Sequence, residues 1–263
     1  MSAIYDTLRD IYTLWLREMT RYVRMKSRIV ATLGMPVLWL LLLGTAFKSS
    51  MRLGPNLGVD YITFMAPGIV AMTILFTSLF AGTSVIFDRE FGFLKEILVA
   101  PVSKTSIILG KGLGGTTTAF IQGIIIIFLS IPVGASYSGD FGLALGIVAA
   151  LGVMFFVALG IVFLGIAVAS RIESMEGFQM LMNFLVMPLF FLSGALYPIG
   201  PLPGWLKALA YIDPLTYCVD ALRHLLIGGA ASQFPLWQDL LVLLAFCGAM
   251  LALGTVMFKR ERD

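Results

Sequence analysis

Six long runs of apolar residues, none of which contains Asp, Glu, Lys, Arg or His, dominate this chain of 263 residues. A helix needs about 20 apolar residues to cross the roughly 30 Å hydrocarbon core of a bilayer, where lipid offers no partner for an open backbone group. With 59% hydrophobic and 13% charged residues, the composition lies outside the range of soluble globular proteins. The sequence therefore predicts an all-α membrane protein with six transmembrane helices, at residues 29–47, 62–87, 112–133, 142–169, 178–197 and 240–258.

The distribution of Lys and Arg predicts the orientation, because basic flanks are retained on the cytoplasmic side of a membrane. If the N-terminus lies inside, the cytoplasmic segments hold 14 of the 18 basic residues. We therefore expect both termini in the cytoplasm. The net charge of +3 reflects this topology and gives no indication of a nucleic-acid partner.

The first 28 residues carry apolar side chains at steps of three or four residues, with charged side chains at other positions. This spacing predicts an amphipathic helix, and its basic polar face and Trp favour a position in the cytoplasmic headgroup layer rather than across the membrane. A simple topology anchor and a docking site for a partner both remain open. The apolar stripe consists of Ile4, Leu8, Ile11, Trp15, Met19 and Tyr22.

Several chemistries are excluded by missing or misplaced motifs. His224 is the single histidine, so no His-based metal cluster can form, and no metal site or catalytic residue is expected. The string G-x-G-x-x-G at Gly110, Gly112 and Gly115 precedes an uncharged span rather than following a strand, so we interpret Gly110 and Gly114 as sites of close helix packing. No G-x-x-x-x-G-K-[ST] occurs, so the chain has no P-loop for ATP.

An ion-coupled transporter, or a channel, that needs no ATPase is the main alternative from another functional class. Such transporters usually place ionisable residues inside the bilayer, and the predicted spans contain none. Sodium sites built from backbone carbonyls keep the class open. A structural membrane subunit with no transport of its own is a third possibility.

Charge is concentrated in residues 88–111, between the second and third predicted spans. Phe91, Leu94 and Leu98 share one helical face, most of the charged residues lie off it, and Pro101 ends the pattern. The pattern predicts a short amphipathic helix on the cytoplasmic surface. An ordinary charged loop that fixes the topology is the alternative.

Two separate runs resemble the permeases of the ABC-2 type transporter family. They are FLKEILVAPVSKTSIILGK, at residues 93–111, and FFLSGALYPIGPLPGWLKALAYIDPLTYCVDALR, at residues 190–223. These permeases are the membrane subunits of ABC exporters, which include daunorubicin-type drug exporters and nodulation lipo-oligosaccharide exporters. The resemblance covers nearly the whole chain and implies a single transmembrane domain over residues 1–263.

The resemblance implies that this chain is not an enzyme and binds no cofactor, because ATP and magnesium bind to a separate ATPase subunit. It implies a homodimer of permeases with two ATPases, embedded in lipid in the cytoplasmic membrane of a prokaryote. The cargo would be a hydrophobic or amphipathic compound moved outward: a drug-like molecule, a lipid or a lipid-linked glycan. The segment after the second span would be the coupling helix that docks on the ATPase, with Arg89, Glu90, Phe91, Leu94, Lys95, Glu96, Leu98 and Pro101 as its contact residues.

The outer segment, residues 194–235, is long for a connector and rich in proline. By resemblance it forms two short re-entrant helices between spans five and six, while a simple extracellular loop is the alternative. An apolar constriction can close a pathway by excluding water, so we expect an external gate here. The residues assigned to the gate and the re-entrant turn are Phe190, Phe191, Leu196, Tyr197, Pro198, Asp213 and Pro214.

Overall fold

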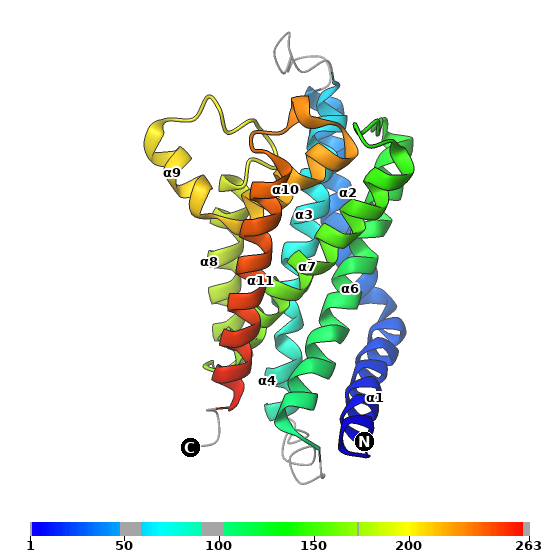
Figure 1. Ribbon diagram of the computed structural model, residues 1–263, viewed down its shortest axis with the longest axis vertical. Helices are drawn as coiled ribbons and strands as arrows, with labels where there is room; N and C mark the ends of the chain where they lie inside the picture. The colour runs from blue at the N-terminus through cyan, green and yellow to red at the C-terminus, as the bar shows by residue number, and fades with distance from the viewer. Residues whose placement is uncertain (1, 48–58, 91–101, 173, 260–263) are drawn as a thin grey trace.

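The computed structural model describes residues 2–47, 59–90, 102–172 and 174–259, and within these ranges the regular structure is helical, with no strand. Figure 1 shows the helices as a bundle along one long axis. In chain order they are α1 (Ser2–Arg24), α2 (Lys26–Phe47), α3 (Tyr61–Ala81), α4 (Thr83–Glu90), α6 (Lys104–Val133), α7 (Leu143–Ala169), α8 (Met175–Leu192), α9 (Gly204–Ile212), α10 (Pro214–Leu226), the 3-10 turn η1 (Gly229–Ala231) and α11 (Leu236–Lys259).

Five of the predicted spans are confirmed as helices that are long and apolar enough to cross a membrane. Within the described residues these are Tyr61–Glu90, Thr105–Val133, Leu143–Ala169, Met175–Leu192 and Leu236–Phe258. The first predicted span falls in α2, whose apolar part, Thr32–Phe47, is shorter than the other five.

Local sequence signals explain where several of these helices begin and end. The Ser103 hydroxyl accepts a hydrogen bond from the Ser106 N–H at 3.0 Å, which satisfies one of the open donors at the start of α6. Gly134 ends the same helix in a left-handed conformation, with φ of 117°, that favours glycine. The Ser174 hydroxyl caps α8 in the same way as Ser103, accepting from the Gly177 N–H at 3.2 Å.

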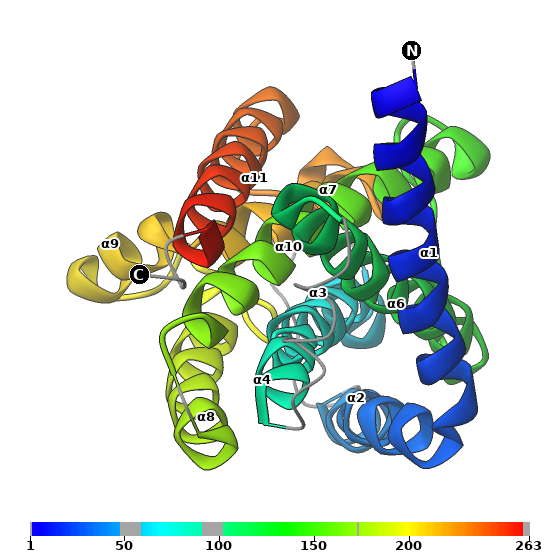
Figure 2. The same ribbon diagram turned by 90° about the horizontal axis from the view of Figure 1, so that it is seen from below.

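Helix α3 is the core of the bundle. Seen along the long axis in Figure 2, it is surrounded by α2, α6, α7 and α10, and most of its side chains are buried. By contrast, α8 and α11 lie at the edge, and only 22% and 17% of their span residues are buried, as expected of helices that face lipid.

Small residues allow the central helices to approach closely. A Cβ added at Gly82 would lie 2.5 Å from the Gly165 carbonyl oxygen, and one added at Gly165 would lie 2.6 Å from the Leu79 carbonyl oxygen. No larger residue fits at either position without moving a backbone. Where lipid is as apolar as the side chains, such close packing is a main source of helix association.

The two ends of the bundle differ. Helix α1 begins and α11 ends at the same end of the molecule, where α4 also ends and α6 begins, and we call this the terminal end (Figure 1). Helices α9 and α10 lie toward the opposite end, so the segment between spans five and six does contain two short helices.

The predicted N-terminal helix is confirmed as α1, which packs along α6. A Cβ at Gly110 would lie 2.5 Å from the Leu14 Cβ, and a Cβ at Gly114 would lie 2.7 Å from the Glu18 Cβ. The interpretation of these two glycines as sites of close helix packing is therefore confirmed. The Trp15 indole N–H also donates to the Thr117 hydroxyl at 3.0 Å.

Candidate functional site: a cavity above a buried ion cluster

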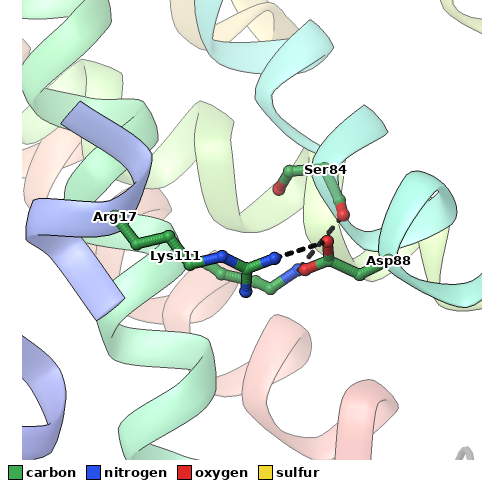
Figure 3. A network of polar contacts seen from close by, with 4 residues as sticks. All are labelled: Arg17, Ser84, Asp88 and Lys111. Carbon is green, nitrogen blue, oxygen red and sulfur yellow. Dashed lines mark hydrogen bonds and ion pairs between the residues drawn. The ribbon is translucent and has the colours of Figure 1, made fainter. Parts of the chain in front are cut away.

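A buried ion cluster joins three helices near the terminal end (Figure 3). One carboxylate oxygen of Asp88, in α4, accepts from the Lys111 ammonium of α6, and the other accepts from the Arg17 guanidinium of α1 at 3.2 Å. The Lys111 ammonium also donates to the Ser84 carbonyl at 3.1 Å. The side chains of Asp88 and Lys111 are each 2% exposed, so this pairing compensates charges that would otherwise be costly to bury.

This cluster corrects the interpretation of residues 88–111 as one surface segment. Asp88 belongs to α4 and Lys111 to α6, and their charges are directed at each other inside the bundle. Only residues 91–103 lie between the two helices, and a docking role for that shorter segment stays a prediction.

The structure places two of the predicted coupling residues. Arg89 donates to the Ile172 carbonyl at 2.9 Å and to the Ser170 carbonyl at 3.5 Å, which fastens the end of α4 to the turn between α7 and α8. Glu90, the last residue of α4, is exposed. The other predicted coupling residues, Phe91, Leu94, Lys95, Glu96, Leu98 and Pro101, lie outside the described residues.

A cavity of about 650 Å³ lies above the ion cluster, bounded by α1, α2, α3, α4, α6 and α8. Lys111 and Ser84 belong to its lining, so the cavity and the cluster share residues. Eleven of the 25 described residues that line it are aromatic or methionine, among them Met35, Trp39, Met72, Phe76, Phe80 and Phe190. The volume is in the range of small-molecule sites, roughly 300–1,000 Å³.

A hydrogen-bonded network of four helices forms the polar part of the cavity wall. The buried amide of Gln122, in α6, donates to the Tyr22 hydroxyl of α1 at 3.0 Å and to the Thr32 hydroxyl of α2 at 2.9 Å. The amide oxygen accepts from the Thr77 hydroxyl of α3. Both amide hydrogens and the amide oxygen therefore have partners, and α1 and α2 are tied to α3 and α6.

The charged lining residues lie on the side of the cavity that adjoins the ion cluster, and we call this side the base. The charged lining residues are Glu18, Arg21 and Lys111. Lys111 is paired with Asp88, and the Arg21 guanidinium lies 5.4 Å from the centre of the Phe87 ring. Across the described residues, no group of His, Cys, Asp and Glu side chains could hold a metal ion.

The residues predicted for the outer gate divide into two groups. Phe190 is 1% exposed and packs edge-to-face on Trp39, at 5.8 Å between ring centres, so it belongs to the cavity wall. Phe191, at 41% exposure, remains on the surface. Side-chain hydroxyls hold the turn beyond α8, because that of Tyr197 donates to the Phe191 carbonyl and that of Tyr61 donates to the Leu196 carbonyl at 3.1 Å.

Pro198, Asp213 and Pro214 all lie in the segment after α8, where the last two shape the start of α10. Pro198 lies half-buried in the irregular stretch before α9. Asp213 caps α10, accepting from the Leu215 N–H at 2.9 Å, and Pro214 occupies the first position of that helix. Burial raises the pKa of the Asp213 carboxyl to about 7.

Sequence reasoning missed the role of Arg223, which is only 3% exposed in α10. Its guanidinium donates to the carbonyls of Gly194 at 2.7 Å, Ala195 at 3.1 Å and Phe64 at 3.2 Å, and lies 3.6 Å from the centre of the Phe64 ring. Burial lowers its pKa to about 9, so the side chain remains charged at neutral pH. Arg223 therefore fastens α10 to α3 and to the turn after α8.

Comparison with known proteins agrees with this architecture. Residues 9–227 match the family described as ABC-2 type transporter. The putative transport permease ycf38 of Porphyra purpurea is 30% identical, over 84% of this chain and 75% of its own length. The daunorubicin resistance ABC transporter permease protein DrrB1 of Streptomyces coeruleorubidus is 25% identical over 100% of this chain and 88% of its own. The inner membrane transport permease YadH of Escherichia coli strain K12 is 25% identical over 95% and 94%.

Proposed function

Because this chain belongs to the ABC-2 type transporter family, we propose that it is the permease subunit of an exporter powered by a separate ATPase subunit. The match over residues 9–227 carries the proposal. One relative is named as a drug-resistance permease, which supports outward movement of a hydrophobic or amphipathic compound. The P-loop motif that holds ATP phosphates does not occur in these residues, so ATP and magnesium would bind to the partner.

The helices that flank residues 91–101 support a coupling role for that segment. Asp88 and Arg89 fix the end of α4 against α6 and the α7–α8 turn, and Lys111 fixes the first turns of α6. Both flanks are therefore tied to the bundle by charged side chains. A force applied by the ATPase to the segment would be transmitted to α1, α6 and α8 rather than absorbed locally.

We assign α2 as the first of six spans. Its 22 residues extend over about 33 Å at 1.5 Å per residue, which is close to the thickness of a bilayer core. The terminal end would then face the cytoplasm of a prokaryotic cell, and α9 and α10 would dip back from the outer face. Two copies of the chain would join two ATPases, and the apolar side chains of Phe191 and Leu196 would close the outer side.

Assembly with the ATPase tests the proposal. Mixed in detergent, the permease and its ATPase should co-purify as a complex of two copies of each chain, measured by native mass spectrometry. Glu96→Lys should weaken this complex, because a charge that loses its partner at an interface costs on the order of 2–5 kcal/mol when buried and far less at a rim.

Glu176→Lys provides the matched control, since Glu176 is an exposed acidic residue in the first turn of α8. It should leave the complex intact. Failure of the parent chain to bind any ATPase would contradict the proposal. An equal effect of both variants would indicate a general electrostatic contribution and remove the specific role of the segment.

A further inference from the structure

We propose that the cavity beside α1 binds one small, mostly apolar, uncharged molecule that carries a hydroxyl or carbonyl group. The inference rests on the proposed transport function for its biological meaning, and it narrows the cargo from amphipaths in general to compact uncharged molecules. It rests structurally on the shape and chemistry of this one cavity.

The apolar part of the cavity is suited to a compact ring system. Its wall combines methionine side chains with the rings of Trp39, Phe76, Phe80 and Phe190. Methionine is flexible and polarizable, so it adapts to ligands of irregular shape and makes favourable contacts with aromatic rings. A volume of about 650 Å³ holds a small molecule. A lipid-linked glycan, with a long tail and several sugars, is too large to be enclosed.

The polar part of the wall predicts which ligand groups would bind there. The Tyr22 hydroxyl accepts from Gln122, which leaves its own hydrogen to donate into the cavity. The Thr118 hydroxyl donates to the Gly114 carbonyl at 3.0 Å, which leaves its oxygen to accept. A ligand carbonyl could accept from Tyr22, and a ligand hydroxyl could pair with either side chain.

The charges at the base argue against a charged ligand. The carboxylate of Asp88 already accepts from both Lys111 and Arg17. Glu18 and Arg21 are three residues apart on α1, which places opposite charges on neighbouring positions of one helix. An anion or cation in the apolar part of the cavity, away from Glu18, Arg21 and Lys111, would bury its charge without a partner, which is costly.

The cavity has a lateral rim through which a molecule dissolved in the bilayer could enter. Met35 of α2 is 60% exposed and Met187 of α8 is 50% exposed, and both line the cavity. At the base, Lys111 lines the cavity and donates to the carboxylate of Asp88, at the end of α4. A bound molecule that shifts Lys111 would therefore also shift Asp88 and the end of α4, the helix that leads into the proposed coupling segment.

A thiol-protection experiment tests the site. Thr118→Cys places a thiol on the cavity wall, whereas Leu241→Cys places one on α11, outside the cavity and 60% exposed in the parent. Cys218 and Cys247 are buried and serve as the background. Each variant, in lipid nanodiscs, is treated with N-ethylmaleimide in the presence of pyrenemethanol, pyrene or the anion pyrenebutyrate.

Pyrenemethanol should slow modification of Thr118→Cys several-fold in a saturable manner and leave Leu241→Cys unaffected. Pyrene, which lacks the hydroxyl, should need about five-fold higher concentration, the factor that corresponds to one hydrogen bond. Adding Tyr22→Phe to Thr118→Cys should remove this difference between the two probes, because it deletes the hydroxyl that pairs with the ligand. Pyrenebutyrate should protect only weakly.

Three outcomes would overturn the proposal: no protection by any probe, equal protection of both thiols, which indicates partitioning into lipid, or equal protection by pyrenebutyrate. Co-purification of each variant with the ATPase is measured in parallel. Protection without ATPase binding would support the ligand site and contradict the exporter function. ATPase binding without protection would support the exporter function and contradict the ligand site.

Discussion

Asp88 and Lys111 form an ion pair in which both side chains are 2% exposed, and this pair joins the end of α4 to the first turns of α6. Lys111 without Asp88 would be a buried, uncompensated charge, whereas Asp88 without Lys111 would keep its pairing with the partly exposed Arg17. The pair therefore positions the two helices between which the proposed coupling segment lies.

Removing the Asp88 carboxylate alone should destabilise the protein more than removing both charges of this pair. Asp88→Asn should lower the free energy of unfolding by about 3–5 kcal/mol, because Lys111 stays buried without its partner. Lys111→Met should lower it by less, because Asp88 keeps its pairing with Arg17. The double variant should recover much of the Asp88→Asn loss. Denaturant unfolding in mixed micelles measures the free energy of unfolding of the parent, the two single variants and the double variant. Additive losses in the double variant would show that the two residues are not coupled.

The packing of α1 on α6 should depend on glycine at two positions. Gly110→Val and Gly114→Val should loosen α1, because the added atoms would overlap Leu14 and Glu18. Protease cleavage within α1 should become faster than in the parent. Gly248→Ala is the control, since a Cβ there meets nothing within 4 Å, and it should leave the cleavage rate unchanged. Equal rates for all four proteins would show that α1 does not need this contact.

The carboxyl of Asp213 should make stability fall with rising pH. Its pKa in the folded state is about 7, above the ordinary value of 3.8, so the folded state holds the proton more tightly. The resulting stability is fully present below about pH 4 and is lost as the pH rises through 7. Asp213→Asn keeps an oxygen that can cap α10, and it should flatten this decline by on the order of 3–4 kcal/mol.

Unfolding of the parent and Asp213→Asn from pH 4 to pH 8 checks this expectation. Asp60→Asn, at an exposed position before α3, should retain the profile of the parent. Parallel profiles of the parent and Asp213→Asn would show that Asp213 carries its charge without penalty.

Polar substitutions at the outer end should make the closed protein leak. Phe191→Ser and Leu196→Ser should let water enter the proposed constriction, because apolar side chains close a pore by excluding water. Efflux of a small solute from proteoliposomes without ATP should rise in both variants. The control is Phe184→Ser, in α8 like Phe191 and 76% exposed in the parent, and its efflux should equal that of the parent. If the gate variants are folded and equally tight, the closure lies elsewhere.

Much of the fold follows from the sequence because bilayer thickness and backbone hydrogen bonding leave few alternatives for long apolar runs. Five spans, the helix at α1 and the close packing at Gly110 and Gly114 could all be predicted in this way. The two short helices after α8 came from family resemblance.

The site could be predicted only in part, because its contacts are tertiary. Asp88 and Lys111 are 23 residues apart, and nothing in the sequence between them reveals that they meet. The sequence predicts Phe190 as a gate residue, whereas the structure packs it against Trp39 of α2 in the cavity wall. Gln122 did leave a signal, since an amide in an otherwise apolar run needs buried partners, although those partners lie on three other helices.

Dependence on a separate ATPase is tested most directly by ATP hydrolysis in proteoliposomes that contain the permease alone, the ATPase alone, or both. The permease alone should release no phosphate, and the mixture should hydrolyse ATP faster than the ATPase alone. Glu96→Lys should reduce that stimulation, while Glu176→Lys should not. Hydrolysis by the pure permease, or an ATPase rate that the permease leaves unchanged, would contradict the account.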